Sequence, residues 1–261
     1  RSSDLRPFVP PIPGLQQAGF LTSDTLWGLA ELPRRLLVLG GGPIGCELAQ
    51  CFARLGSEVT QVEMAPHVLG REDEDASAVV AQALRDDGIE LLTGHEAVRV
   101  ETIDGEHRLI VRQGQVERAV AFDRLLCAVG RSPRVAGYGL EELGIPLSTV
   151  KTIETNAWLE TLYPNIYAVG DVAGPYQLTH VAAHQAWYAA VNALFGLFKR
   201  FRVDYSVIPR ATFTDPEVAR VGLSEAEANA QGVSVEVTRF PLADLDRAIA
   251  DGTTRGFIKV L

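Results

Sequence analysis

The first half of the chain alternates short apolar runs with longer amphipathic segments. Three short runs have the character of buried parallel strands: residues 36–39, 58–62 and 89–92. Two segments between them carry apolar side chains at helical spacing and precede a glycine that favours a helix end: residues 43–55 and 73–87. The order β-α-β-α-β predicts an α/β fold of the Rossmann-like, doubly wound kind.

The rest of the chain carries patterns of a different kind. Within residues 96–129, apolar side chains fall near alternate positions between turn signals, which predicts an antiparallel β-meander that ends in a buried strand over 125–129. Ser224 with Glu227 fits the capping box of a helix start. The pattern predicts four further elements: a strand at 166–169, an amphipathic helix at 181–198, and strands at 235–238 and 256–261.

Composition excludes several classes of function. Of the 261 residues, 47% are hydrophobic and 22% are charged, as in an ordinary globular protein. The formal net charge of −9 argues against a nucleic-acid partner, which requires clustered Lys and Arg. No apolar run approaches the roughly 18 residues that cross a bilayer, and three cysteines do not form a secreted disulfide framework. We expect a soluble cytoplasmic protein with no membrane or nucleic-acid partner.

The predicted strand at 36–39 runs into a loop of the G-x-G-x-x-G type, and a predicted helix follows. The loop consists of Gly40, Gly41, Gly42, Pro43, Ile44 and Gly45. In a dinucleotide site the first glycine permits the tight turn, the second lets the backbone approach the pyrophosphate, and the third allows close helix–strand packing. The helix N-terminus then offers free N–H groups and a positive dipole to the phosphates.

Glu63 completes this pattern. It lies at the end of the second predicted strand, 18 positions after Gly45, close to the ~20 expected for a carboxylate that binds an adenosine ribose. Its charge would repel a 2′-phosphate, and Met64, Ala65 and Pro66 supply no cation. The sequence therefore predicts a nicotinamide-dinucleotide site with NAD(H) favoured over NADP(H), in preference to an ordinary tight turn.

Further motifs occur in a fixed order along nearly the whole chain. After the loop and Glu47 come A-V-G-R-S-P at 128–133, A-V-G-D at 168–171, L-T-H at 178–180 and A-T-F-T-D-P-E at 211–217. With this set the chain resembles the pyridine nucleotide-disulfide oxidoreductases, the family of dihydrolipoamide dehydrogenase, glutathione reductase and mercuric reductase. The resemblance implies a homodimeric oxidoreductase that passes hydride from NADH to FAD and on to a disulfide-type or mercuric acceptor.

The resemblance also implies parts of three domains. Residues 34–150 match the NAD-binding domain, 151–202 match the returning part of the FAD-binding domain, and 203–261 match part of an α+β dimerisation domain. The Pro-rich residues 1–33 are expected to be a connector from the FAD domain. The family's first FAD-binding loop, redox Cys pair and flavin-side lysine would precede this chain, and its C-terminal His-Glu pair would follow it. We therefore expect a fragment that is inactive alone.

The family's cofactor contacts carry over to matching positions. Glu47 would pair with a lysine beside the flavin, a supporting catalytic role in the cleft between nicotinamide and flavin. Asp171 follows an apolar run, where open α/β sheets place ligand contacts, and would bind the FAD ribitol. Pro43 departs from members that place an aromatic gate over the flavin. The other implied contacts are Thr179 and His180 against the flavin, Ala97 near the adenine, and Gly130 with Arg131 at the nicotinamide-side cleft.

Several reactive side chains are expected to have no redox or metal role. Cys46 and Cys51 have the spacing of a redox pair, but on a helix they point about 140° apart. Their Cα atoms would be roughly 8–9 Å apart, beyond the ~7 Å limit for a disulfide, so we expect core thiols. Cys127 is expected to be inert. His180 and His184 have metal-ligand spacing without a third ligand nearby in sequence, so we expect no metal site.

The leading hypothesis is thus part of a flavoprotein enzyme, and two alternatives stay open. An isolated NAD-binding module without catalysis, made by truncation, would bind NADH but carry no flavin. A relative of NADH oxidases or ferredoxin reductases is disfavoured by the motif at 214–217, which resembles the interface domain of the disulfide reductases.

Overall fold

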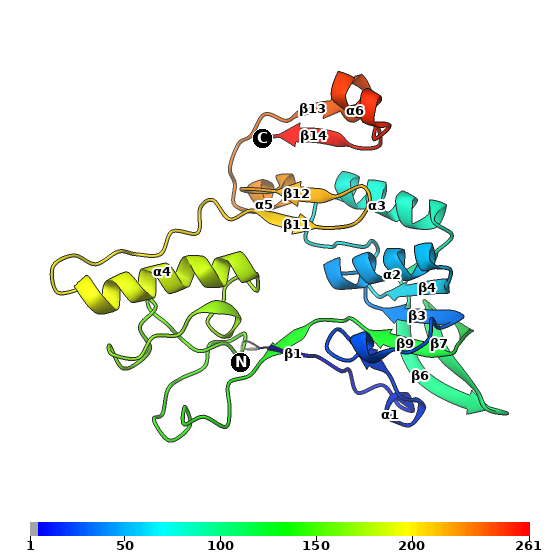
Figure 1. Cartoon of the computed structure of the whole chain (residues 1–261), viewed down its shortest axis with the longest axis horizontal. Coiled ribbons are helices and arrows are strands. Elements are labelled where there is room, and N and C mark those ends of the chain that lie inside the picture. Colours follow the sequence, from blue (N-terminus) through cyan, green and yellow to red (C-terminus); the bar gives the residue numbers. More distant parts are fainter. Residues whose placement is uncertain (1–4) are drawn as a thin grey trace. The chain divides into compact units, whose positions relative to one another are not determined.

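The computed structural model describes residues 5–261, so the first four residues of the predicted connector lie outside the described residues. The chain divides into two compact units. One combines residues 5–6 with Arg131–Arg210, and the other combines Pro7–Gly130 with Ala211–Leu261. Figure 1 shows the order of the elements along the chain. Among the described residues, no helix has both the length and the apolar character that a membrane span requires.

The larger unit is built on a five-stranded parallel sheet with the strand order β2-β9-β3-β4-β5. Its strands are β2 (Leu21–Thr22), β3 (Arg35–Leu39), β4 (Glu58–Glu63), β5 (Glu90–Thr93) and β9 (Arg124–Cys127). The helices α2 (Pro43–Leu55) and α3 (Glu74–Asp86) connect β3 to β4 and β4 to β5. The predicted β-α-β-α-β order is confirmed, and with it the Rossmann-like α/β fold class.

An antiparallel meander follows β5 and consists of β6 (Glu96–Ile103), β7 (Glu106–Gln113) and β8 (Val116–Phe122). Asp104 and Gly105 form its first turn with positive φ angles of 53° and 81°, and such two-residue turns favour Asp-Gly. The predicted meander is confirmed, and the strand predicted at 125–129 is β9.

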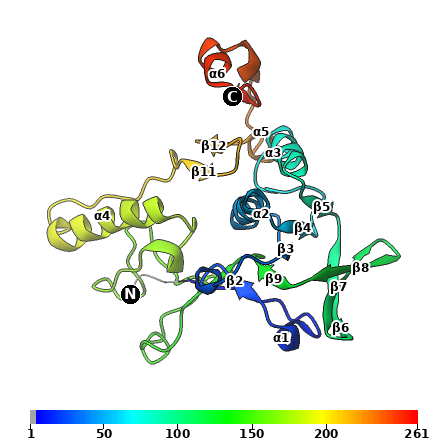
Figure 2. The ribbon, with the colours of Figure 1, turned by 45° about the vertical axis from the view of Figure 1, so that its right-hand side comes forward.

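Different elements cover the two faces of the parallel sheet. On β3, Leu36 and Val38 pack in one cluster with residues of α2 and α3. The intervening Leu37 and Leu39 pack in a second cluster with residues of the meander. Because alternate side chains of a strand point to opposite faces, this apolar strand is buried on both sides. Figures 1 and 2 show α2 and α3 on one side of the sheet and the meander on the other.

Within residues 5–34, the elements ahead of β3 are short: β1 (Leu5–Pro7), α1 (Leu15–Ala18), β2 and the 3-10 helix η1 (Leu26–Gly28). Leu15 is buried in the cluster formed with the meander, and Leu26 is buried in the cluster formed with α2 and α3. Part of the predicted connector therefore belongs to the core of the larger unit.

The C-terminal part of the chain contains two small sheets and short helices. Its elements are β11 (Arg210–Thr212), β12 (Val218–Arg220), α5 (Glu225–Ala230), β13 (Thr238–Pro241), η3 (Leu242–Asp244), α6 (Asp246–Asp251) and β14 (Phe257–Val260). The predicted capping box of Ser224 and Glu227 is present at the start of α5. The strand predicted at 256–261 is β14. The strand predicted at 235–238 is wrong, because β14 pairs with β13 only from Thr238 onward.

In the smaller unit most of the chain is irregular outside one helix. The helix α4 (Thr179–Phe195) confirms the one predicted at 181–198, and β10 (Arg131–Pro133) pairs with β1. The strand predicted at 166–169 is wrong, since Tyr167 forms only an isolated bridge with Glu160 among the described residues. An apolar run becomes a strand only where neighbouring strands take up its backbone hydrogen bonds.

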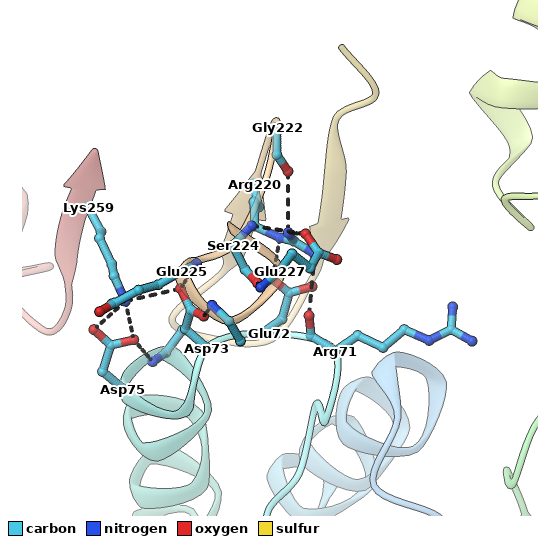
Figure 3. A network of polar contacts seen from close by, with 12 residues as sticks. Arg71, Glu72, Asp73, Asp75, Arg220, Gly222, Ser224, Glu225, Glu227 and Lys259 are labelled. Carbon is cyan, nitrogen blue, oxygen red and sulfur yellow. Dashed lines mark hydrogen bonds and ion pairs between the residues drawn. The ribbon is translucent and has the colours of Figure 1, made fainter. Parts of the chain in front are cut away.

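A network of ion pairs joins the start of α3 to the C-terminal part of the same unit (Figure 3). The Arg220 guanidinium lies 2.9 Å from Glu72 and 2.5 Å from Glu227. Its side chain is only 13% exposed, so these charges interact in a partly water-excluded site. Arg220 thereby fixes α5 and β12 to the segment that precedes α3.

Lys259 of β14 is the second cation of this network. Its ammonium lies 3.0 Å from Asp73 and 3.1 Å from Asp75. The Asp73 carboxylate also accepts the N–H groups of Glu225 and Ala226 at the start of α5. Burial alone would raise the pKa of Asp73, but these hydrogen bonds and Lys259 outweigh it and lower the pKa.

We predict that Arg220→Met lowers the free energy of unfolding by about 2 kcal/mol, because it leaves the carboxylates of Glu72 and Glu227 without their shared cation. Denaturant unfolding measures this change. The control is Arg247→Met, because Arg247 pairs with Asp251 at a site where 82% of the arginine side chain is exposed. A loss within about 0.5 kcal/mol is expected there. Equal losses in the two variants would contradict the prediction.

Candidate functional site

The glycine-rich loop of residues 40–45 joins the C-terminal end of β3 to the start of α2. Close contacts require glycine at both of its ends. Gly40 has a φ of 113°, and a Cβ there would lie 2.5 Å from the carbonyl oxygen of Ala128. A Cβ on Gly45 would lie 2.2 Å from Gly40 O. The chain can therefore turn this tightly from strand to helix only without side chains at these positions.

Glu63, the last residue of β4, is held against the side of the loop. Its Oε2 accepts the Gly41 N–H at 2.5 Å, and its Oε1 accepts the Ala65 N–H at 2.6 Å. A Cβ on Gly41 would lie 2.8 Å from the Glu63 Cγ, so the glycine leaves room for this carboxylate. Each carboxylate oxygen retains capacity for a further hydrogen bond from a ligand.

The loop is open at Gly42. A Cβ at this position would meet no heavy atom within 4 Å. Gly42 is the N-cap of α2, and Pro43 is its first residue. The first N–H groups of a helix have no partner within the helix, and together with the helix dipole they favour a bound anion. The geometry fits a phosphate-bearing ligand beside Gly42 and a hydroxyl-bearing group at Glu63.

Glu47, in the first half of α2, contacts the C-terminal part of the same unit. Its Oε1 accepts the Phe213 N–H at 2.8 Å. Gln50 accepts the Asp215 N–H at 2.7 Å and donates to Asp215 O at 2.9 Å. The motif at 211–217 therefore docks on the helix that begins at the loop. The role of Gln50 was not predicted, because no local signal marks a helix residue that pairs with distant backbone.

The other predicted cofactor residues divide between the two units. Ala97, at an irregularity in β6, and Gly130 belong to the larger unit. Gly130 O accepts the Phe8 N–H at 2.9 Å, which ties the end of the sheet to the segment after β1. The predicted residues of the smaller unit are Arg131, Asp171, Thr179 and His180.

In the smaller unit, a buried side chain organises the segment that carries Asp171. Gln185 of α4 is fully buried, accepts the Gly170 N–H at 2.5 Å and donates to Gly174 O at 2.6 Å. Asp171 lies between these two glycines, in the 3-10 helix η2 (Gly170–Val172). Gln185 was not predicted, although an amide within an otherwise apolar stretch of helix is a signal, because a buried amide needs partners.

The motifs and the loop geometry agree with the comparisons to known proteins. Residues 4–186 match the family model described as pyridine nucleotide-disulphide oxidoreductase, and residues 208–261 match the model of that family's dimerisation domain. The chain belongs to the pyridine nucleotide-disulphide oxidoreductase family. The resemblance inferred from the ordered motifs is confirmed.

Individual members of this family are similar over most of the chain. It is 42% identical over 252 residues to a dihydrolipoyl dehydrogenase of Thermus scotoductus, covering 93% of this chain and 54% of the relative. It is 37% identical over 255 residues to a mercuric reductase of Lysinibacillus sphaericus, covering 98% and 46%. The Cu(II) complex of the HOCl-induced flavoprotein disulfide reductase RclA from Escherichia coli matches with a TM-score of 0.87 at 34% identity, covering 98% of this chain and 59% of that chain. The chain thus spans about half the length of the curated relatives it matches.

The three cysteines of the chain are free, and Cys46 and Cys51 are not joined by a disulfide. Cys46 is buried, and burial raises its pKa to about 12, so its thiol stays protonated. The expectation that Cys51 is a core thiol is wrong, because Cys51 is exposed. The rotation of about 140° between the two positions turns Cys51 away from the buried face of α2. Cys127 is buried, and burial raises its pKa.

His180 and His184 each contact backbone of the segment after α4. The ring Nε2 of His180 lies 2.7 Å from Pro209 O, and that of His184 lies 2.7 Å from Asp204 O. Within residues 5–261, no group of three or more His, Cys, Asp or Glu side chains is arranged to hold a metal ion. The i, i+4 spacing of the two histidines therefore ties α4 to the chain that follows it.

Alanine substitutions at Gly45 and at Gly42 should have different effects on the free energy of unfolding. We predict that Gly45→Ala lowers the free energy of unfolding by about 3 kcal/mol, because its methyl group would overlap Gly40 O. Gly42→Ala should leave stability unchanged or raise it slightly, because its φ of −76° suits alanine. Denaturant unfolding of both variants checks this, and equal destabilisation would contradict the loop geometry.

Proposed function

We propose that this chain binds NAD(H) at the loop of residues 40–45. The supporting observation is the Glu63 carboxylate, which is held at the Gly41 N–H beside the open Gly42 position. The pyrophosphate would lie at the N-terminus of α2, where the backbone can be approached closely. Glu63 would accept hydrogen bonds from the ribose hydroxyls of the adenosine.

The same carboxylate favours NAD(H) over NADP(H). A 2′-phosphate would bring a further negative charge next to Glu63, and like charges repel. An arginine near this position can accommodate that phosphate in NADP sites. Here Met64, Ala65 and Pro66 follow Glu63. NADH is therefore the proposed nucleotide.

For the whole protein we propose an NADH-dependent flavoprotein that passes hydride through FAD to a disulfide-type or mercuric acceptor. The names of the relatives support this: dihydrolipoyl dehydrogenase, mercuric reductase and flavoprotein disulfide reductase. Bound FAD would supply a two-electron carrier between nicotinamide and acceptor, while the chain orients the two rings. The residues proposed to contact the cofactors outside the loop are Ala97, Gly130, Arg131, Asp171, Thr179 and His180, with Glu47 in a supporting role.

The match of residues 208–261 to a dimerisation domain supports a homodimer of the whole protein. In that protein residues 34–150, 151–202 and 203–261 would belong to the NAD-binding, FAD-binding and dimerisation domains. A second candidate function for this chain alone is an NAD-binding module without catalysis. It is favoured by the position of the loop and Glu63 within one compact unit, since nucleotide binding then needs no residue of the other unit.

We predict that the purified chain binds NADH and that its affinity for NADPH is lower by a factor of at least about ten. Gly42→Ala should abolish binding, because its methyl group would occupy the path of the pyrophosphate. Isothermal titration calorimetry measures both affinities and the loss in Gly42→Ala.

The absorption spectrum separates the flavoprotein enzyme from the isolated NAD-binding module. A chain without the flavin band is the module, and a retained flavin band supports the enzyme. A correctly folded wild-type chain that does not bind NADH would contradict the proposal.

We predict that Glu63→Gln reduces the preference for NADH over NADPH, because it removes the charge that repels the 2′-phosphate and keeps an acceptor for the Gly41 N–H. The ratio of the two dissociation constants is the measured quantity. Glu58→Gln is the control, since Glu58 lies at the other end of β4 and is 68% exposed. An unchanged ratio in Glu63→Gln would show that this charge does not set the preference.

A further inference from the structure

Gln61 is a polar side chain in the middle of a buried strand. It is fully buried in β4, and the apolar Val59 and Val62 of the same strand are buried as well. Its Nε2 donates to Gly40 O at 2.9 Å. Its Oε1 is buried and has no hydrogen-bond partner among the described residues. An orphaned buried acceptor lowers stability, so an apolar residue at position 61 would stabilise the core more. The hydrogen bond from Gln61 to Gly40 O therefore indicates a role other than packing.

Two side chains of β4 form hydrogen bonds with the C=O and the N–H of a single peptide group in the loop. Gly40 O and the Gly41 N–H belong to the same peptide group, and Gln61 donates to the first while Glu63 accepts from the second at 2.5 Å. Side chains two positions apart on a strand lie on the same face, so both reach the same loop. A third bond, from Gly40 N–H to Val62 O at 2.8 Å, lies between them.

The next peptide plane then has a defined direction. Gly41 O accepts the Leu69 N–H at 2.7 Å and the Cys46 thiol at 3.3 Å. In a trans peptide the C=O and the N–H point in opposite directions. A Gly41 carbonyl held from the inner side therefore turns the Gly42 N–H toward the open side of the loop, where the pyrophosphate is proposed to bind.

We propose that Gln61 is a positioning residue of the dinucleotide site. By donating to Gly40 O, Gln61 fixes the orientation of the first peptide plane of the loop. That plane in turn sets the direction in which the following N–H groups point toward the phosphates. Its Nε2 would lie 3.3 Å from a Cβ on Gly45, so the amide sits beneath the contact between the two ends of the loop. The proposal rests on the NAD(H) function proposed above and adds a residue that itself touches no ligand.

Gln61→Met tests this role, because methionine has a similar length and no comparable donor. The dissociation constant for NADH should rise about tenfold. The unfolding midpoint should stay close to that of the wild type, because the loss of the orphaned Oε1 offsets the Gly40 O that is left without its donor. Gln82→Met is the matched control, since Gln82 is an exposed residue of α3 whose amide bonds to Asp86. It should change neither quantity.

Two nucleotide fragments separate positioning from a general structural effect. ADP-ribose keeps the pyrophosphate, and its affinity should fall in Gln61→Met by the same factor as that of NADH. Adenosine lacks the pyrophosphate, and its affinity should not change. An unchanged NADH affinity, or a loss that follows the midpoint and extends to adenosine, would overturn the role of Gln61.

Gln61→Leu repeats these measurements if Gln61→Met does not fold. A wild-type chain that does not bind NADH would overturn the proposed function, and the role of Gln61 with it, before any variant is measured. A wild-type chain that binds NADH, with variants that bind it equally well, would overturn only the role of Gln61.

Discussion

The hydrogen bond from the Gly40 N–H to Val62 O continues the pairing of β3 with β4 past Leu39, the last residue of β3. At the point where the chain must turn into a helix, its backbone is still held by the sheet. Gly40 then turns with a φ of 113°, and Gly45 returns to pack against Gly40 O. The directions of the loop N–H groups are thus fixed by a rigid element, which is the condition for a preorganised binding site.

The sheet can hold the loop in this way because it is covered on both faces. The side chains of β3 alternate between the cluster with the two helices and the cluster with the meander. A one-residue shift of β3 would exchange these two sets and would also move Gly40 away from Val62. The packing of the core and the geometry of the loop are therefore consequences of the same register.

The parts of the fold that the sequence predicts have local causes. The loop, the flanking strand and helix, Glu63 and the Asp104–Gly105 turn depend on residues close together in the chain, and the structure contains the elements as predicted. The pairing of Gln50 with Asp215 and that of Gln61 with Gly40 join positions that no motif connects. The strand predicted at 166–169 fails for the same reason, since its existence depends on partners elsewhere rather than on its own apolar residues.

The charge distribution raises a further question, because a chain of net charge −9 is proposed to bind an anionic dinucleotide. Charges farther away than about 8 Å are largely screened at physiological ionic strength, so the groups next to the ligand decide its binding. Arg220 and Lys259 are engaged with carboxylates of their own network. At the loop the attraction comes instead from backbone N–H groups and the helix dipole, which act at short range. On the function proposed above, a neutral donor set of this kind would bind the pyrophosphate, while Glu63 beside it would disfavour a ligand with one phosphate more.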